Sequence, residues 1–502
     1  MLASIPSAIV LGVDGHPVLV EVHVGPGLPG TTIVGLPDAS CREARDRVHA
    51  GLKSAGITVT AKKTIVNLSP SSVRKPGAVL DLALVVGLLV ANELLDPAAV
   101  ADTAFLGELG LDGSVKAVPG MLSAVAACRA SRVVVPLAAY HEARLVEGRD
   151  VRGVGGLAEL LAALAGEAPW PDPPVRPVAA APAVAPDLAD VRGQPVARRA
   201  LEIAAAGGHH LLLVGPPGAG KTMLARRMPG LLPPLVAADA LQVTRVHSAA
   251  GQALPPDGLI EIPPFRAPHH TASAVALIGG GSATLRPGEL SLADCGVLFL
   301  DELAEFPAVV LDAMRQPLEE GVVRINRASI KVELPSRVLL VGAMNPCPCG
   351  GGGPGVCRCG PGSLARYRRR LSGPLLDRFD LRVEVGRPDP DDLLRGAPGE
   401  PTEPVATRVL AARVRAVERG VGCNAQLRGA ALDAAVPLEG AGRDLLERRL
   451  RTGSLSARGL DRVRVVARTI ADLDGVDAVG PEHLATALHL RADVLGSLQA
   501  AC

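Results

Sequence analysis

The chain has 502 residues, of which 48% are hydrophobic and 21% are charged. That length exceeds one ordinary domain and the apolar share excludes a disordered chain, so we expect roughly two to four folded domains. The 52 Lys and Arg residues almost balance the 51 Asp and Glu residues. The overall charge therefore predicts no polyanionic partner, and any nucleic-acid contact has to come from a local patch. Aromatic residues make up only 2% of the chain, which excludes base stacking as the main mode of nucleic-acid binding.

Residues 1–168 alternate short apolar runs with amphipathic runs and predict a first α/β domain. Strands are expected at Ile9–Val13, Val18–Val24, Thr31–Val34 and Thr64–Leu68, and helices at Cys41–Ser54 and Val79–Asn92. The longest apolar run, Ala78–Leu95, is interrupted by polar residues, and the N-terminus lacks a basic region. We therefore expect neither a membrane span nor a signal peptide. Nine cysteines in so long a chain predict no disulfide scaffold and favour a cytoplasmic protein.

A proline- and alanine-rich stretch, residues 169–187, is predicted to be an extended linker, because prolines at this density exclude a helix or a central strand. Residues 188–387 predict a second α/β block, and residues 388–502 show helical spacing without a strand pattern. The expected strands are Leu211–Val214, Val297–Leu300 and Val338–Ala343. The expected C-terminal helices are Thr407–Arg419, Ala441–Leu450, Leu460–Ala471 and Pro481–Leu490.

The segment after the first of these strands has the spacing of a phosphate-binding loop. It consists of Gly215, Pro216, Pro217, Gly218, Ala219, Gly220, Lys221 and Thr222. Backbone N–H groups of such a loop bind the phosphates of ATP, and glycines allow their close approach. Lys221 is expected to neutralise phosphate charge, and Thr222 to bind Mg²⁺. A chance glycine-rich loop is the alternative, which the flanking strand and helix patterns disfavour.

Two acidic residues, Asp301 and Glu302, follow the buried strand Val297–Leu300 at the end where ligands bind in α/β sheets. Asp301 is expected to hold Mg²⁺ through water, and Glu302 to orient or deprotonate the attacking water. Together with the phosphate-binding loop, this pair predicts ATP hydrolysis with Mg²⁺ as the cofactor.

Six longer segments resemble the AAA+ ATPases, and more narrowly their magnesium-chelatase-like branch called the YifB/ComM family. They are GLPDASCREARDRVHAGLKSAG (35–56), VRGQPVARRALEIAAAGGHHLLLVGPPGAGKT (191–222), VLFLDELAEF (297–306), LVGAMNPCPCG (340–350), LSGPLLDRFDL (371–381) and LSARGLDRVRVVARTIADL (455–473). The resemblance covers nearly the whole chain. It implies an AAA+ P-loop α/β core at 188–387 and a helical, magnesium-chelatase-like C-terminal lid at 388–502.

The resemblance implies four further nucleotide contacts, which are Gln194 beside the nucleotide, Asn345 as the first sensor, Arg378 as the arginine finger and Arg458 as the second sensor. Fixed guanidinium groups suit such roles, because they stabilise the charge that develops during phosphoryl transfer. Since Arg378 would be presented to the ATP of a neighbouring subunit, the resemblance also implies a homo-oligomeric ring, expected to be a hexamer. A plain ion pair with Asp377 or Asp461 is the alternative for the two arginines.

The same branch carries two insertions, which in the family face the pore of the ring and touch the translocated polymer. Pro263–Gly296 matches the first insertion, and Leu318–Val332, with the alternation of a β-hairpin, matches the second. A metal site at His269 and His270 is an alternative use of the first insertion, but no third ligand at suitable spacing accompanies them.

The first domain is similar to the S5-like proteolytic domain of the Lon proteases, through residues 75–89 and 105–121. The positions that correspond to the Ser–Lys dyad of Lon fall at about Val79 and Leu122. Neither side chain can act as a nucleophile or a base. We therefore expect a non-proteolytic domain that contacts a partner or DNA.

Four cysteines form two C-x-C pairs around a glycine-rich loop, and four thiolates can bind Zn²⁺ tetrahedrally. They are Cys347, Cys349, Cys357 and Cys359. The C-x-C spacing is tighter than the usual C-x-x-C, so a labile disulfide pair and plain reduced thiols are alternatives. The following stretch, Ser363–Arg370, places four arginines around Tyr367 and is a candidate contact for a DNA phosphate backbone. A solvated or subunit-contact face is the alternative.

These features predict an ATP-driven ring motor that acts on DNA. The family resemblance implies a helicase that promotes branch migration of single-stranded or branched DNA during natural transformation or recombination. One alternative is a chelatase-type or chaperone-like motor that remodels a protein partner, and another is a regulatory ATPase that binds a partner without translocating. The Lon-like first domain argues against the chelatase-type motor, since we expect the resemblance to magnesium chelatase to be confined to the motor and the lid.

Overall fold

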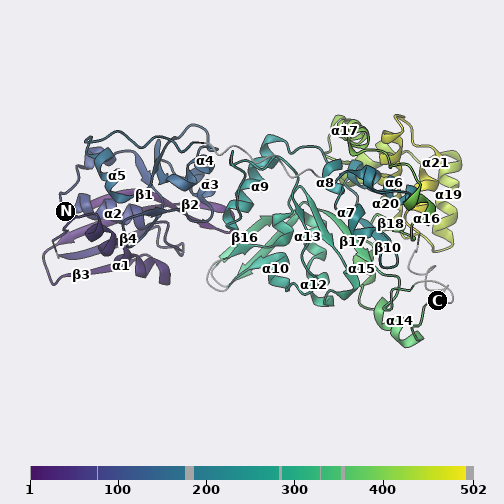
Figure 1. Cartoon of the computed structure of the whole chain (residues 1–502), viewed down its shortest axis with the longest axis horizontal. Coiled ribbons are helices and arrows are strands. Elements are labelled where there is room, and N and C mark those ends of the chain that lie inside the picture. The colour runs from purple at the N-terminus through teal and green to yellow at the C-terminus, as the bar shows by residue number, and fades with distance from the viewer. Residues whose placement is uncertain are drawn as a thin grey trace.

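A four-stranded sheet in the order β1-β2-β4-β3 forms the base of the N-terminal part of the protein in the computed structural model (Figure 1). Its strands are β1 (Leu2–Leu11), β2 (Asp14–Gly25), β3 (Gly30–Val34) and β4 (Lys63–Ser69), and the helices beside it are α1 (Ala39–Ser54) and α2 (Asp81–Ala91). Each strand and helix predicted here is found, although β1 begins at Leu2 rather than at Ile9. All 11 residues of α2 are buried, so the longest apolar run of the chain is a core helix.

The structure describes residues 2–60, 62–75, 77–175, 186–281, 285–327, 330–351 and 357–492. Figure 1 shows the N-terminal part at one end of an elongated molecule, the parallel sheet in the middle, and the C-terminal helices gathered at the other end. Within the described residues, no helix is long and apolar enough to cross a membrane.

The N-terminal part also contains a second, smaller sheet that the sequence patterns did not resolve. It is parallel, in the order β5-β8-β9, and a short hairpin of β6 and β7 lies nearby. The remaining elements of the N-terminal part are η1 (Pro97–Val100), β5 (Thr103–Phe105), β6 (Glu108–Leu109), β7 (Val115–Lys116), α3 (Met121–Ala127), β8 (Arg132–Pro136), η2 (Leu137–Ala139), α4 (Tyr140–Ala143), β9 (Asp150–Val154) and α5 (Leu157–Leu164). Both sheets share one apolar cluster.

The stretch predicted to be a linker is not separate from the N-terminal part at its start. Trp170 is partly buried against the N-terminal core, and the Arg132 guanidinium lies 5.8 Å from the centre of its ring. Residues 176–185 of the predicted linker lie outside the described residues.

The central part is built on a five-stranded parallel sheet in the order β11-β14-β17-β10-β18. Its strands are β10 (Leu211–Val214), β11 (Phe265–Arg266), β14 (Val297–Leu300), β17 (Leu339–Met344) and β18 (Leu381–Glu384). Every residue of β10, β14 and β17 is buried, as expected for central parallel strands that are covered on both faces. The mixed α/β prediction for the central part is therefore confirmed.

Helices and two hairpins complete the central part. The helices are η3 (Leu188–Asp190), α6 (Pro195–Gly207), α7 (Lys221–Ala225), α8 (Met228–Leu231), α9 (Ala237–Ala249), α10 (Ala274–Ile278), α11 (Glu289–Leu292), η4 (Leu303–Glu305), α12 (Ala308–Ala313), α13 (Arg315–Glu320), α14 (Pro361–Arg368) and α15 (Gly373–Leu376). The hairpins pair β12 (Gly279–Gly280) with β13 (Arg286–Pro287), and β15 (Val322–Arg327) with β16 (Ile330–Pro335). The second of these is the hairpin predicted from the alternation in Leu318–Val332.

The N-terminal part packs directly on the central part. Val13, in the turn between β1 and β2, is buried in the same apolar cluster as Val332 and Leu334 of β16. The Ser248 hydroxyl on α9 donates a hydrogen bond to the partly buried carboxylate of Glu142. The hairpin that the family resemblance assigns to the second insertion therefore lies against the N-terminal part.

The C-terminal part is helical and is held to the central sheet by an ion pair and by a hydrogen bond to the backbone. Its elements are α16 (Pro390–Leu394), α17 (Thr402–Glu418), η5 (Asn424–Gln426), α18 (Gly429–Ala435), α19 (Gly440–Arg451), α20 (Ala457–Leu473) and α21 (Pro481–His489). Asp380, immediately before β18, is 1% exposed and accepts a 2.9 Å hydrogen bond from Arg462 of α20. The guanidinium of Arg491 donates to the carbonyl of Phe379 at 2.8 Å. The segment that carries Arg378 is thus tied to the C-terminal helices.

Candidate nucleotide-binding site

The predicted site residues follow three neighbouring strands of the central sheet. The phosphate-binding loop follows β10, the pair Asp301–Glu302 follows β14, and Asn345 follows β17. Because these strands are parallel and adjacent in the order β14-β17-β10, their carboxyl ends meet at one edge of the sheet. The structure therefore brings together residues that lie more than a hundred positions apart in the chain.

Three glycines give the phosphate-binding loop its shape. Gly218 and Gly220 have φ angles of 78° and 92°, a left-handed conformation that other residues rarely adopt. A Cβ atom on Gly215 would lie 2.0 Å from the carbonyl oxygen of Val385. The loop therefore passes close to the end of β18, and α7 begins directly after Gly220.

The ammonium group of Lys221 lies inside this loop. It donates to the carbonyls of Gly215 at 2.6 Å and Pro216 at 2.9 Å, and to the side-chain oxygen of Asn345 at 3.1 Å. Burial lowers the pKa of Lys221, and the nearby carboxylates of Asp301 and Glu302 oppose this change. A buried cation beside a glycine loop is a fitting partner for phosphate oxygens.

Thr222 and Asp301 form the second half of the site. The Thr222 hydroxyl donates to a carboxylate oxygen of Asp301 at 2.7 Å, and the other carboxylate oxygen accepts from the backbone N–H of Glu302 at 2.9 Å. A hydroxyl and a carboxylate are the hard oxygen ligands that Mg²⁺ prefers beside phosphate groups. The donor set and the glycine cradle therefore fit a magnesium–triphosphate.

Glu302 is held by a residue that the sequence analysis did not connect with it. Its backbone is left-handed with a φ angle of 51°, and its side chain is 56% exposed. A carboxylate oxygen of Glu302 lies 3.0 Å from Nδ1 of His270. The sequence could not predict this contact, because His270 follows the two-residue strand β11 and nothing in the local pattern shows that β11 pairs with β14.

Gln194 lies against the phosphate-binding loop from the side of α6. Its backbone is left-handed, with a φ angle of 56°, and it caps the N-terminus of α6. The side-chain amide donates to the carbonyl of Gly386 at 2.6 Å and more weakly to that of Ala219 at 3.4 Å. Gln194 thus connects the loop with the end of β18.

In the part of the chain that the structure describes, the two predicted arginines, Arg378 and Arg458, form no ion pair or hydrogen bond with the phosphate-binding loop. Arg378 is 4% exposed, and its guanidinium pairs with Glu319 of α13 rather than with Asp377. Arg458 is exposed at the start of α20. Burial, and the nearby guanidinium groups of Arg458 and Arg462, lower the pKa of Arg378 even though Glu319 opposes the shift.

The four cysteines come together immediately after Asn345. All four Sγ atoms lie within 4.8 Å of one another, and among the described residues no other group of three or more His, Cys, Asp or Glu side chains has such geometry. The Sγ atoms of Cys347 and Cys349 are 3.4 Å apart, those of Cys347 and Cys357 are 3.7 Å apart, and those of Cys349 and Cys357 are 4.0 Å apart. In a tetrahedral site with Zn–S bonds of about 2.3 Å, neighbouring sulfurs lie about 3.8 Å apart. None of the four forms a disulfide.

The cysteine cluster is packed on the nucleotide site. A Cβ atom on Gly350, in the turn after Cys349, would lie 2.8 Å from the ring of Pro217. Tyr367 of α14 is 6% exposed, and its hydroxyl donates to the carbonyl of Asn345 at 2.9 Å. Tyr367 therefore anchors α14 to the residue that follows β17.

The arginines around Tyr367 do not form one uniform surface. Arg366 and Arg369 are exposed, whereas Arg370 pairs with Glu305 at 2.5 Å and donates to the carbonyl of Ala304 at 3.1 Å. The side chain of Arg368 lies outside what the structure describes.

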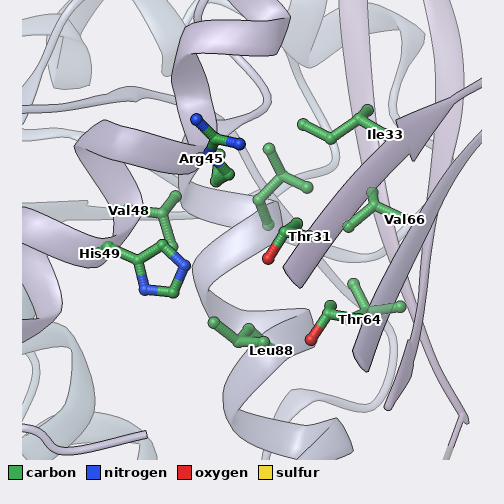
Figure 2. Close-up of a pocket in the computed structure, with 10 residues that line it drawn as sticks. Thr31, Ile33, Arg45, Val48, His49, Thr64, Val66 and Leu88 are labelled. Atoms are coloured by element: carbon green, nitrogen blue, oxygen red, sulfur yellow. The ribbon is translucent and has the colours of Figure 1, made fainter. Parts of the chain in front are cut away.

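A small apolar cleft lies far from these groups, in the N-terminal part. Figure 2 shows Arg45, Val48 and His49 of α1 facing Thr31 and other side chains of β3 and β4 across this cleft. It contains no carboxylate, and it lacks the set of acid, base and nucleophile that a catalytic site needs. This cleft is therefore not a candidate catalytic site.

Comparison with known proteins matches nearly the whole length of the chain. A family model described as magnesium chelatase, subunit ChlI, matches residues 187–393, one described as subunit ChlI of Mg-chelatase matches residues 20–139, and one described as the C-terminal part of subunit ChlI matches residues 399–491. Uncharacterised protein YifB of Escherichia coli is 42% identical over 495 residues, which cover 98% of this chain and 97% of that protein. Competence protein ComM of Haemophilus influenzae is 40% identical over 502 residues, which cover 98% of each chain.

The chain belongs to the YifB/ComM family. An uncharacterised protein of Mycobacterium tuberculosis is also 44% identical over 492 residues, covering 97% of each chain. Over 175 residues, 35% of this chain and 21% of the relative, the chain is 27% identical to the probable DNA helicase MCM9 of Oryza sativa. Membership of the magnesium-chelatase-like AAA+ proteins indicates ATPase activity with ATP and Mg²⁺.

One argument from the sequence is overturned by these matches. A family model named after magnesium chelatase covers residues 20–139, so the resemblance to chelatase subunits is not confined to the central and C-terminal parts. The N-terminal part therefore does not argue against a chelatase-type activity in the YifB/ComM family.

Proposed function

We propose that this chain is an ATP-hydrolysing ring motor that acts on DNA, and more narrowly a helicase that promotes branch migration during natural transformation or recombination. The observation that carries the ATPase half is the meeting of Lys221, Thr222, Asp301 and Asn345 at one edge of the parallel sheet. The DNA half is supported by the name of the competence protein ComM and, over a shorter stretch, of the probable helicase MCM9.

Each group at the sheet edge has a proposed task in hydrolysis. The N–H groups of the glycine loop and the Lys221 ammonium bind the triphosphate, and Thr222 and Asp301 hold Mg²⁺, which neutralises charge on the phosphates. Glu302 orients the attacking water and accepts its proton. Asn345, fixed by its contact with Lys221, contacts the γ-phosphate or the water. Gln194 supports the loop from the side of α6.

The proposed ring is supported by the family and by the arginines that would contact a neighbouring subunit. Arg378 and Arg458 lie close enough to influence each other electrostatically, and the described partner of Arg378 is Glu319 rather than a group of its own phosphate-binding loop. We propose that Arg378 serves the ATP of a neighbouring subunit in a hexamer, which requires the Arg378–Glu319 pair to open, and that Arg458 is the second sensor. An arginine finger stabilises the charge of the transition state and completes the site only at a subunit interface.

For the remaining parts we propose the organisation that the sequence implied. Residues 1–168 form a Lon-protease-like, S5-like domain whose dyad positions hold the buried, unreactive side chains of Val79 and Leu122, and residues 169–187 link it to the core. The helices of residues 388–502 form the lid of the ATPase core at 188–387. The N-terminal domain is an interaction module and not a protease.

A chelatase-type or chaperone-like motor that remodels a protein partner is the second candidate function. It is favoured by the three family models, all of which carry the name of a magnesium chelatase subunit. The two candidates differ in what stimulates hydrolysis, since a DNA motor responds to DNA and a remodelling motor responds to its protein partner.

The proposed function is tested by strand displacement. The full-length protein is incubated with ATP, Mg²⁺ and a forked or three-stranded DNA that carries one labelled strand, beside the Lys221→Ala variant. We expect ATP-dependent displacement by the wild type only. Tight binding of the DNA without displacement in any orientation of the fork would overturn the helicase proposal.

We also propose that Cys347, Cys349, Cys357 and Cys359 bind one Zn²⁺. The four Sγ atoms are spaced as a tetrahedral site requires, and the cluster joins the phosphate-binding loop, Asn345 and α14. Zinc would thus fix the end of β17, which is followed by Asn345, relative to α14. Reduced thiols also favour a cytoplasmic location, where glutathione keeps cysteines unoxidised.

Metal analysis of the purified full-length protein tests the zinc site. We expect about one zinc per chain, and a large loss in the Cys349→Ser variant but not in Cys295→Ser, which alters a cysteine outside the cluster. Zinc far below one equivalent and unaffected by Cys349→Ser would remove the proposal.

A further inference from the structure

One buried tyrosine fixes the arginine-rich helix α14 to the central part. Tyr367 is 6% exposed and lies in the same apolar cluster as Met344, the last residue of β17, and Leu303, the first residue of η4. The ring therefore shares its apolar surroundings with the end of β17 and with the segment that follows β14.

The hydroxyl of Tyr367 holds the backbone of Asn345. It donates to the Asn345 carbonyl at 2.9 Å, while the side-chain oxygen of Asn345 accepts from the Lys221 ammonium at 3.1 Å. A backbone bond from the N–H of Gly215 to the carbonyl of Met344, at 3.1 Å, joins the same strand end to the phosphate-binding loop. Asn345 is thus held from the loop on one side and from α14 on the other.

Arg370, in the turn after α14, holds the segment that follows Glu302. Its guanidinium donates to the carbonyl of Ala304 at 3.1 Å and pairs with the Glu305 carboxylate at 2.5 Å. Both acceptors belong to η4, and the N–H of Glu305 donates to the carbonyl of Glu302 at 2.7 Å. The N–H of Arg370 in turn donates to the carbonyl of Tyr367 at 3.2 Å. The contacts to Asn345 and to η4 therefore come from one turn of the chain.

Glu302 and Asn345 lie beyond the paired part of their strands. The pairing of β14 with β17 ends where Leu300 lies opposite Gly342. Backbone pairing between these strands therefore does not fix the distance between the two site residues. A displacement of about 1 Å between reacting groups can lower a rate by about 100-fold. A direct connection between the two strand ends is a means of preventing such a displacement.

We propose that Tyr367 and Arg370 are positioning residues that hold Asn345 and the Glu302 segment at the spacing that ATP hydrolysis requires. They act through the two strand ends and do not themselves bind the nucleotide. The inference rests on the proposed function, because it takes Glu302 to activate water and Asn345 to contact the γ-phosphate or the water. It assigns the arginine-rich segment a task in the ATPase site that does not depend on contact with DNA.

Steady-state ATP hydrolysis without DNA tests the two contacts. Tyr367→Phe removes one hydroxyl and keeps the buried ring, and we expect kcat to fall by about three- to tenfold at an unchanged KM for ATP, as the loss of one net hydrogen bond implies. Arg370→Gln should lower kcat to a similar extent, because the shorter amide cannot make both contacts to η4. An unchanged kcat in Tyr367→Phe, or a KM that rises as much as kcat falls, would overturn the inference.

Two variants control for substitutions of the same kind elsewhere. Tyr140→Phe removes the hydroxyl of the other tyrosine, which is buried in the N-terminal part, and Arg451→Gln breaks an exposed ion pair with Glu447 on α19. Both should hydrolyse ATP like the wild type. If the controls lose as much kcat as Tyr367→Phe and Arg370→Gln, the effect is not specific to these contacts, and the inference is wrong.

Fluorine NMR gives a readout that does not depend on catalysis. The chain contains two tyrosines, so labelling with 3-fluorotyrosine yields two signals, which Tyr140→Phe assigns. Addition of Mg²⁺ and a non-hydrolysable ATP analogue should shift the Tyr367 signal, because the analogue contacts the residue that its hydroxyl holds, and should leave the Tyr140 signal unmoved. A Tyr367 signal that stays in place while a fluorescent ATP analogue binds would contradict the positioning role.

These outcomes separate the inference from the proposed function. If the protein neither binds the analogues nor hydrolyses ATP, the ATPase proposal fails and the inference falls with it. If ATP is hydrolysed without any response to DNA, only the DNA motor fails, and the kcat values of Tyr367→Phe and Arg370→Gln still decide the positioning role.

Discussion

The hydroxyl of Thr222 donates a 2.7 Å hydrogen bond to the carboxylate of Asp301, across 79 positions of the chain. Thr222 stands in the first turn of α7 and Asp301 at the end of β14, so their contact depends on the whole parallel sheet. The distance shows that the two groups proposed to hold Mg²⁺ are already adjacent. Substitutions of single side chains at this sheet edge can therefore test which groups bind Mg²⁺ and which promote hydrolysis.

Asp301→Asn should raise the Mg²⁺ concentration that half-saturates ATP hydrolysis by about tenfold or more, because one carboxylate charge is lost while an oxygen that can accept from Thr222 remains. The measurement is phosphate release as a function of Mg²⁺ at saturating ATP. Thr222→Ser keeps the hydroxyl and serves as the matched control. An identical Mg²⁺ dependence in Asp301→Asn and wild type would contradict the assignment.

Lys221→Ala and Glu302→Gln should separate binding from hydrolysis. Loss of the Lys221 ammonium should weaken binding of a fluorescent ATP analogue by about 10- to 100-fold, as expected for a charge-assisted contact. Glu302→Gln should bind the analogue like the wild type but lower kcat by about 100-fold or more, because the amide cannot accept a proton. If Glu302→Gln loses affinity as strongly as Lys221→Ala, Glu302 is not the water-activating group.

Mixing two inactive variants should restore hydrolysis if Arg378 acts on a neighbouring subunit. Arg378→Ala alone should lower kcat by about 1,000-fold, and Lys221→Ala alone should be inactive. In mixed rings, a Lys221→Ala subunit still supplies Arg378 to an adjacent Arg378→Ala subunit whose phosphate-binding loop is intact. Activity of the mixture no greater than the sum of its parts would contradict a site shared between subunits.

His210 should make the folded protein sensitive to mild acid. Burial lowers the pKa of His210 from 6.5 to about 4, and its Nδ1 accepts a hydrogen bond from the N–H of Leu340 at 3.1 Å. The unfolded chain then binds more protons between these two values, so the free energy of unfolding falls as the pH drops from 6.5 toward 4, by at most about 3 kcal/mol. Urea unfolding as a function of pH measures this loss.

His210→Asn is the matched control for that pH dependence, because the Asn side-chain oxygen can accept from Leu340 without titrating. The variant should lose less stability than the wild type over the same pH range. The remaining loss comes from sites such as His209, whose pKa is also lowered by burial. A pH profile that is unchanged by His210→Asn would contradict a lowered pKa of the imidazole at this position.

Local pattern was enough to predict the strands and loop that build the site. Leu211–Val214 and Val297–Leu300 are short and uniformly apolar, Gly215 follows the first and Asp301 the second, and both strands begin and end where the pattern placed them. Parallel strands fix which ends come together, so the proximity of the phosphate-binding loop to Asp301 followed from the fold class.

The contacts that local pattern could not predict are those between segments with no shared periodicity. Whether His270 reaches Glu302 depends on the pairing of the two-residue strand β11 with β14, which leaves no trace in spacing. The burial of Tyr367 depends on how α14 returns to the end of β17, although an arginine-rich sequence suggests an exposed helix. Arg378 pairs with Glu319 of α13 rather than with its sequence neighbour Asp377, because the tertiary fold brings α13 next to the Arg378 side chain.

The most direct test of the central claim is the rate of ATP hydrolysis by the full-length protein with and without forked DNA, at fixed Mg²⁺ and beside Lys221→Ala. The account predicts that the wild type hydrolyses ATP, that DNA increases its turnover severalfold, and that Lys221→Ala shows neither activity. Wild-type turnover that forked and single-stranded DNA leave unchanged, or hydrolysis that persists in Lys221→Ala, would contradict an ATP-driven DNA motor built on this site.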